Sequence, residues 1–245
     1  MDFNLSVMNP LIWVLIIFIA LVVGFALLVR FVKAFARTIV ILVILSIVVG
    51  ASIYVIRDAN DLRVNFLPKE KLLVLDLDNN IVAAVISKDI SVPVPVTDVK
   101  GLNTLYHAKD YQAMLGSNYK LLVFKWDTFK DLKVVGDNTY TFSIEDVKKV
   151  MTLEDPKSYY IEQQLGSDAA MFAGIVSSQV DKVFPTNDYF RSVVFSFMIA
   201  KSFEDASVFE AYVNGDVSIY PETITLKLVR WLPFNWVRDF VADKM

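Results

Sequence analysis

The amino-acid sequence predicts an α+β protein in which a transmembrane helical hairpin precedes a mixed globular domain. The chain of 245 residues is 55% hydrophobic and only 21% charged, with a mean hydropathy of +0.48, which is more apolar than an ordinary soluble protein. The apolar residues are unevenly distributed along the chain, because residues 3–29 and 38–56 contain no charged side chain. The remaining chain alternates short apolar runs with turn residues, as expected for early antiparallel strands, central helices and a late strand.

The expected membrane anchor covers residues 11–56, after a short N-terminal tail over residues 1–10. Residues 11–29 are nineteen uncharged residues, which as a helix rise about 28 Å and match the roughly 30 Å hydrocarbon core of a bilayer. Residues 38–56 repeat this length and composition. A cleaved signal peptide fits less well, because the tail has no Lys or Arg. We therefore expect two membrane-spanning helices.

The eight residues that join these spans, RFVKAFAR, contain neither Gly nor Pro. They are compatible with a continued helix or with a short turn at the membrane surface. Arg30, Lys33 and Arg37 share one helical face, so their side chains are expected to reach lipid headgroups. In either case we expect a tight hairpin.

Small residues recur at a spacing of four in both predicted spans. Ala20 and Gly24 lie in the first span, and Ser46 and Gly50 lie at matching depth in the second. Small side chains let helix backbones approach closely. This spacing predicts packing between the two spans, with a contact between copies of the chain as the alternative.

The distribution of cations predicts how the anchor is oriented. No Lys or Arg precedes the first span and three follow it directly, which places the connecting loop in the cytoplasm and both termini outside the cell membrane. Four cations after the second span, Arg57, Arg63, Lys69 and Lys71, oppose this assignment. The first span is given more weight because it usually dominates. We therefore expect a two-pass integral membrane protein with extracytoplasmic termini.

Charge and composition exclude several classes of function. Residues 1–56 carry three cations and one anion, a balance of +2, so the net charge of −3 leaves −5 for residues 57–245. An acidic domain argues against nucleic acid as a partner, since phosphates require clustered Lys and Arg. The chain has no Cys and one His, His107, so disulfides, thiolate chemistry and an ordinary zinc site are excluded. No cofactor is expected.

A polar connector over residues 57–70 leads into the domain, residues 71–245. An early β-hairpin is predicted around Asn79-Asn80, because Asn tolerates the positive φ of a two-residue turn. A capping signal at Ser143 to Asp146 predicts the start of a helix. Residues 193–200 are apolar on every side but too short to span a bilayer, which predicts a buried core helix. The predicted strands are 71–78, 81–88, 119–126, 132–135, 139–142, 217–220 and 222–229, and the predicted helices are 102–115, 143–151, 157–165, 168–184 and 188–213.

The C-terminal segment, residues 230–245, is rich in aromatic side chains and is expected to be helical. Trp231, Phe234, Trp236 and Phe240 form its apolar face. A terminal helix docked on its own domain is the favoured interpretation. The alternative is contact with a membrane surface or a partner subunit, because Trp is typical of the headgroup zone.

Residues 72–82, LLVLDLDNNIV, place an Asp-x-Asp pair at the end of an apolar run. This pattern resembles the first motif of haloacid-dehalogenase-like phosphatases. The resemblance implies that Asp76 is the nucleophile and Asp78 the acid/base beside Mg²⁺, with Ser87 and Asp137 in the places of later motifs. A β-hairpin turn explains the same residues without catalysis. It is the favoured interpretation, because the short segment from Asp76 to Ser87 cannot hold the helical crossover between parallel strands.

The same cluster allows one further alternative. Asp76, Asp78 and Asn80 offer the hard oxygen ligands that Ca²⁺ prefers, although the segment lacks the glycine and distal glutamate of an EF-hand. The sequence as a whole favours a non-enzymatic membrane protein that holds an acidic domain at the outer face of the membrane. We expect it to be a subunit or scaffold of an envelope complex, with the lipid bilayer, other membrane proteins or further copies of itself as partners.

Overall fold

The computed structural model describes residues 10–66, 68–88, 93–136, 141–166, 169–204 and 207–231. The chain divides into two compact units, Met1–Arg57 and Asp58–Met245, and each is described by itself. The first unit is helical from Pro10 onward, and the second is a mixed α+β domain. The expected class, an apolar helical segment followed by an α+β domain, is confirmed.

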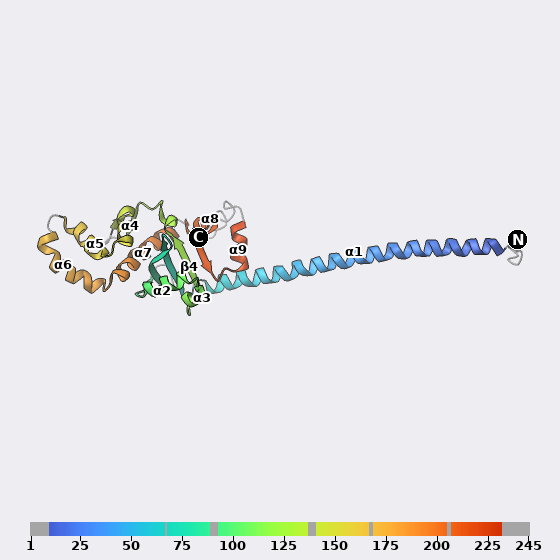
Figure 1. The fold of residues 1–245 in the computed structure, drawn as a ribbon, viewed down its shortest axis with the longest axis horizontal. Coiled ribbons are helices and arrows are strands. Elements are labelled where there is room, and N and C mark those ends of the chain that lie inside the picture. Colours follow the sequence, from blue (N-terminus) through green and yellow to red (C-terminus); the bar gives the residue numbers. More distant parts are fainter. Residues whose placement is uncertain are drawn as a thin grey trace. The chain divides into compact units, whose positions relative to one another are not determined.

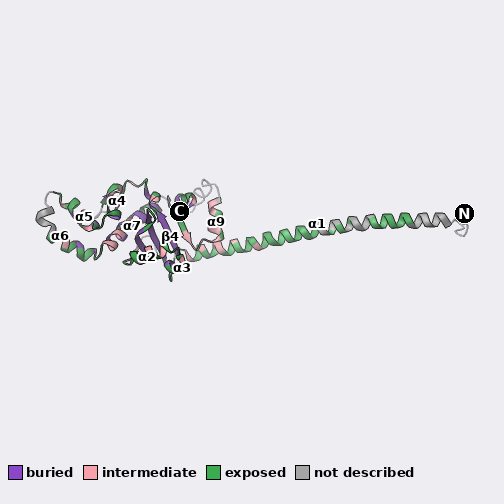
Figure 2. Cartoon of the chain, in the orientation of Figure 1, coloured by how far each residue is buried: buried purple, intermediate pink, exposed green. Residues whose placement is uncertain are grey.

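Helix α1, Pro10–Asn65, contains the apolar segment and continues into the first residues of the second unit. Its apolar side chains are exposed along most of the described length, as Figure 2 shows in green. Within the described part of the chain, one stretch is long and apolar enough to cross a membrane, Thr38–Asn65, with a mean hydropathy that reaches 3.0. By length and composition, this stretch could cross a membrane.

The structure does not show the expected hairpin, because α1 continues without a turn through residues 30–37. The connecting sequence has no Gly or Pro, which is compatible with the continued helix that the sequence also allows. Ala20, Gly24 and Ser46 are exposed, and a Cβ added at Gly24 or Gly50 would meet nothing within 4 Å. Among the described residues, none packs closely against Gly24 or Gly50 in this continuous helix. Arg30 is exposed, and the side chains of residues 33 and 37 lie outside the described set.

The second unit is built on a five-stranded sheet with the order β3-β2-β1-β4-β7. Neighbouring strands are antiparallel except for the central pair, β1 and β4, which is parallel. The early hairpin and the late strand are confirmed, whereas the parallel pairing was not expected. The strands are β1 Lys71–Leu77, β2 Asn80–Ser87, β3 Val94–Pro95, β4 Lys120–Lys125 and β7 Val217–Tyr220.

The hairpin turn lies one residue earlier than expected. Asp78 and Asn79 adopt positive φ angles of 54° and 63°, which is the backbone conformation of a type I′ turn. Asn80 is already paired with Leu77 in the ladder. Asp and Asn tolerate this conformation better than other non-glycine residues, which explains why the turn forms here.

Helices α2, Val99–His107, and α3, Tyr111–Leu115, cover one face of the sheet (Figure 1). The single helix expected over residues 102–115 is wrong, because the chain breaks at Lys109, where φ is 57°. A second cap then restarts the helix, since the Asp110 carboxylate accepts a hydrogen bond from the Ala113 amide at 2.9 Å. The break places Tyr106, near the end of α2, beside Tyr111 at the start of α3, with ring centroids 6.2 Å apart.

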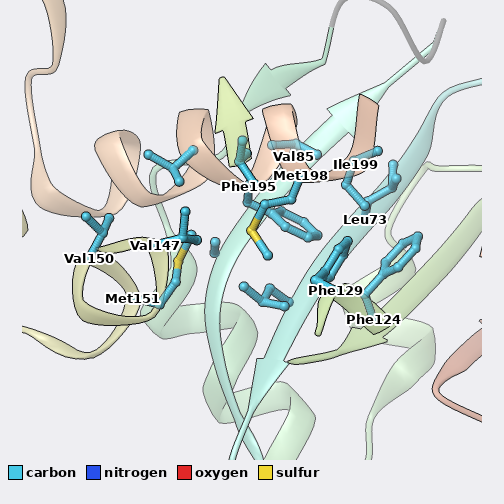
Figure 3. Packing of buried hydrophobic residues seen from close by; sticks show 14 of the residues in the cluster. Leu73, Val85, Phe124, Phe129, Val147, Val150, Met151, Phe195, Met198 and Ile199 are labelled. Carbon is cyan, nitrogen blue, oxygen red and sulfur yellow. The ribbon is translucent and has the colours of Figure 1, made fainter. Parts of the chain in front are cut away.

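The opposite face carries the larger core, in which α7, Asn187–Glu204, lies against β2. Figure 3 shows Phe195, Met198 and Ile199 from this helix pointing toward Phe124 and Phe129. The predicted core helix over residues 193–200 is confirmed. The remaining elements on this side are the short 3₁₀ helix η2 Trp126–Phe129, the hairpin β5 Val134–Gly136 and β6 Thr141–Ser143, and helices α4 Ile144–Thr152, α5 Pro156–Leu165, α6 Ala169–Val183 and α8 Ser207–Asn214.

The strand expected over residues 222–229 is wrong, because this segment forms helix α9, Ile224–Trp231. Its alternating pattern is short enough to fit either structure. Asp58 favours the helix, since its carboxylate accepts a hydrogen bond from the Thr225 amide at 2.7 Å, in the first turn. The expected C-terminal helix from residue 232 onward, which includes Phe234, Trp236 and Phe240, lies outside the described residues, as does the Trp231 side chain.

Candidate functional site

The α2/α3 face of the sheet holds a cavity of about 310 Å³ at the edge where β1 and β4 end and β7 begins. Side chains two apart on a strand share a face, so Leu72, Val74 and Asp76 of β1 point to this side. The first two are covered by α2 and α3, whereas Asp76 reaches the cavity. The lining residues are Asp76, Tyr106, Tyr111, Val123, Lys125, Ser218, Ile219, Tyr220 and Glu222.

A β-bulge adjoins Asp76. Leu75 pairs with Ala83 and Asp76 with Ile81, so the register shifts and Val82 is the extra residue on β2. Bulges interrupt strand pairing and change the direction of nearby side chains, and they are common beside binding sites. The bulge therefore gives a local structural reason for the position of this carboxylate.

The Asp76 carboxylate is buried, with 5% of the residue exposed. The Tyr106 hydroxyl donates a hydrogen bond to its Oδ2 at 2.8 Å. Its other oxygen, Oδ1, is buried and receives no hydrogen bond from the described residues. Among those residues no cation forms an ion pair with Asp76. A buried acceptor without a donor is costly, which makes this oxygen the most unusual feature of the site.

Three tyrosine rings stand next to this carboxylate. The rings of Tyr106 and Tyr111 are 6.2 Å apart in an edge arrangement, and those of Tyr111 and Tyr220 are 5.8 Å apart. Tyr220 is held further by a hydrogen bond from its hydroxyl to Gln112 Oε1 at 3.2 Å. Burial and the hydrogen bond to Asp76 raise the pKa of the Tyr106 hydroxyl, so it is a neutral donor at physiological pH. The cavity therefore combines one carboxylate with an aromatic wall.

Two charged side chains at the edge of the cavity have other partners. Glu222 Oε1 lies 3.1 Å from Arg230 Nη1 and accepts a hydrogen bond from the Tyr212 hydroxyl at 3.1 Å. Lys125 is exposed, and its Nζ donates to the Gly215 carbonyl at 3.1 Å. Neither of these groups donates a hydrogen bond to Asp76, so its Oδ1 has no donor among the described residues.

The residues singled out from the sequence are separated by the fold. Asp78 lies in the exposed turn, where its carbonyl accepts a hydrogen bond from Asn80 Nδ2 at 3.1 Å. Ser87 is buried at the far end of β2, where it pairs with Lys71. Asp137 lies outside the described residues. The antiparallel hairpin thus moves Ser87 away from Asp76, and only Asp76 reaches the cavity.

The oxygen ligands proposed for a cation are not gathered into one set. His107 Nε2 lies 3.3 Å from Asn80 Oδ1, on the exposed side of the turn, whereas Asp76 is bonded to Tyr106. The described residues contain no group of three or more acidic or histidine side chains spaced to hold a metal ion. Asp76 therefore lies inside the domain, whereas Asp78 and Asn80 are exposed to solvent.

Sequence reasoning missed the tyrosines, Lys125 and Glu222 as lining residues. The one available signal was the pattern of polar residues on the α2/α3 face of successive strands, at Asp76, Lys125 and Ser218. This signal becomes readable only when the strand order is known. No family model, no curated protein and no solved structure matches this chain, so its function is argued from the site and the anchor alone.

Proposed function

We propose that this chain is a membrane-anchored, non-catalytic protein that presents its acidic α+β domain at the outer face of the membrane, as a subunit or scaffold of an envelope complex. The observation that carries the proposal is the apolar surface of α1. Ile41, Leu42, Val43, Ile44 and Leu45 are consecutive, and 53–57% of each is exposed. Five consecutive residues occupy every side of a helix.

An apolar surface on all sides points to lipid rather than to one protein partner. A helix that packs on a protein buries one stripe and keeps the opposite face polar. Burial of apolar surface is worth about 25 cal/mol per Å², so this helix gains much more in a bilayer than in water. Backbone groups within the helix are already hydrogen bonded, as a bilayer core requires. The segment is therefore suited to span a membrane.

We further propose that residues 11–29 enter the same bilayer, which makes the protein two-pass. The 56 residues of α1 would extend about 84 Å as one straight helix, far beyond the roughly 30 Å hydrocarbon core. A straight helix would leave one uncharged segment in water. A turn at residues 30–37 removes this cost and leaves its three cations at the headgroups. Both termini then lie outside, following the cation count.

Cysteine labelling tests this topology, because the chain has no native Cys. Ser6→Cys, Ala34→Cys and Asp131→Cys are expressed singly, and intact cells are treated with a membrane-impermeant thiol reagent. We expect reaction at positions 6 and 131 and protection at 34 until the cells are opened. Reaction at 34 alone would reverse the sidedness. Protection at 6 with reaction at 131 would show a single pass.

The non-catalytic assignment is tested against the phosphatase resemblance. Purified protein is assayed with phosphate esters and Mg²⁺, alongside Asp76→Asn and Asp78→Asn. We expect no metal-dependent turnover above the level of the variants. The exposed position of Asp78 in the turn and the distance of Ser87 along β2 support this expectation. Turnover that is lost in both variants would overturn it.

The proposed role in a complex is tested by the apparent mass of the detergent-solubilised protein. Membranes solubilised in mild detergent are separated under native conditions, and the chain is expected to migrate well above one 27.8 kDa copy with its micelle. Co-expression of two differently tagged copies then distinguishes a homo-oligomer from a complex with other proteins. Migration as a single copy would contradict the scaffold proposal.

A further inference from the structure

We propose that the cavity beside β1 binds a small protonated organic amine, with the Asp76 carboxylate as its counter-ion and the rings of Tyr106, Tyr111 and Tyr220 as its walls. This inference goes beyond the anchoring function and does not depend on it. It rests on the buried oxygen of Asp76, the aromatic wall and the size of the cavity.

Because Asp76 Oδ1 lacks a hydrogen-bond donor within the described part of the chain, the cavity favours a ligand that carries a positively charged donor. Asp76 lines the cavity; Tyr106 satisfies its Oδ2, whereas its Oδ1 is buried and has no donor among the described residues. A hydrogen bond from a cation to a carboxylate is about twice as strong as one between neutral groups. An ammonium group supplies the donor and the opposite charge together, which a neutral alcohol cannot do.

The tyrosine rings add a preference for a cation. Positive charge is attracted to the face of an aromatic ring, and more strongly where water is excluded. Tyr111 contacts both of the other rings, so the three form one continuous wall. Hydrogen bonds to Asp76 and Gln112 fix two of the hydroxyl groups. The wall is thus formed before any ligand arrives.

The volume limits the ligand. A cavity of about 310 Å³ is at the small end of the ~300–1,000 Å³ range of ligand sites. It suits a compact amine with a short alkyl or aryl group and excludes a long peptide. Val123 and the rings of the three tyrosines supply the apolar surface that such a group requires.

Replacement of Lys125 tests the sign of the charge on the ligand. Its ammonium lies at the cavity edge and is bonded to Gly215. A positive charge there repels a bound amine. Removal of this charge is therefore expected to strengthen amine binding, whereas it would weaken binding of an anion or of a zwitterion that uses Lys125 as an anchor.

Binding to the full-length protein in detergent is measured by titration calorimetry at neutral pH with three probes. Butylammonium carries charge and donors, tetramethylammonium carries charge alone, and butan-1-ol matches the first probe in size without charge. We expect affinity to fall in that order. Equal affinity for butan-1-ol and butylammonium, or no saturable binding of butylammonium, would overturn the proposal. So would displacement of butylammonium by an equal concentration of Mg²⁺, which would assign the site to a metal.

Four variants locate the binding. Asp76→Asn is expected to weaken butylammonium binding at least tenfold, and Tyr111→Leu by about three- to tenfold. Asp78→Asn makes the same charge change two residues away in the exposed turn and is expected to leave affinity within about twofold, since exposed charges are largely screened. Lys125→Gln is expected to bind as tightly as the parent or more tightly. Near-ultraviolet circular dichroism confirms that each variant is folded. Equal effects of Asp76→Asn and Asp78→Asn, or weaker binding by folded Lys125→Gln, would contradict the assignment.

Discussion

Capping side chains determine where several helices of the domain begin. Asp98, Asp110, Ser143 and Asp155 each accept a hydrogen bond from an amide in the first turn of the following helix. Helix starts have unpaired amides, and a short polar side chain satisfies one of them. The cap at Ser143 was predicted from the sequence, because it requires only residues three apart.

Ser143→Ala tests this cap. The Ser143 hydroxyl accepts from the Asp146 amide at 3.2 Å and donates to the Asp146 carboxylate at 2.7 Å. We expect a loss of about 1 kcal/mol in the free energy of unfolding, measured by urea denaturation in detergent. Ser177→Ala, at a partly exposed position in α6, is the control and is expected to change stability by less than about 0.5 kcal/mol.

The same cluster predicts a pH dependence. Hydrogen bonds from Ser143 and then Tyr159 hold the pKa of the Asp146 carboxyl below its ordinary value. A lowered folded-state pKa stabilises the protein fully above the unfolded pKa of about 3.9, and this contribution is lost as pH falls through the folded value. The stability difference between the parent and Asp146→Asn is therefore expected to be largest above about pH 5 and to shrink below pH 4. A difference that stays constant with pH would contradict this account.

At the scale of elements, β1 is the centre of the domain. All seven of its residues are buried, because α2 and α3 cover one face and α7 covers the other. A strand covered on both sides needs apolar residues at nearly every position, which is the pattern of KLLVLDL. The strand has two polar residues, one near each end. Lys71 Nζ donates to the carbonyls of Phe66, Lys69 and Lys88, whereas Asp76 lines the cavity.

Phe195→Ala tests how α7 is held on this sheet. The Phe195 ring is fully buried and meets the rings of Phe124 and Phe129 at about 6 Å. Its removal leaves a cavity in a close-packed core, so we expect a loss of about 3–5 kcal/mol in the free energy of unfolding. Phe209→Ala is the matched control, because 41% of Phe209 is exposed. A similar loss in both variants would contradict the proposed packing.

At the scale of the whole molecule, the boundary between the units lies at Asp58, within α1 rather than after it. The last turns of α1 belong to the domain, since Asp58 accepts from the Thr225 amide and Asp61 accepts from the Tyr119 hydroxyl at 2.6 Å. Hydrogen bonds to charged groups contribute about 1.5–3 kcal/mol each. The segment expected to be a connector therefore stabilises the domain.

Truncation tests this boundary. A chain that begins at Asp58 is expected to remain in the supernatant after ultracentrifugation of a detergent-free lysate and to unfold cooperatively. A chain that begins at Lys71 loses both bonds and is expected to be less stable by at least about 1.5 kcal/mol. Equal stability of the two truncated chains would show that residues 58–70 are a linker. Sedimentation of the longer chain with membranes would indicate that another segment binds lipid.

The sequence by itself determined the features that depend on neighbouring residues. The uncharged runs predict a membrane-spanning segment, Asn79-Asn80 predicts the β1–β2 turn to within one residue, and Ser143 predicts a helix start. In each case the physical cause, whether apolar surface, backbone φ or an amide three residues away, is contained within one stretch of chain.

Only the tertiary structure decided the features that join distant stretches. Residues 222–229 alternate like a strand but form a helix, because Asp58 lies at its first turn. The parallel pairing of β1 with β4 and the antiparallel pairing of β4 with β7 bring Asp76, Lys125 and Tyr220 to one face. A side chain far along the sequence contributes to a site only once strand order and register are fixed. The cavity therefore has no counterpart in any local motif.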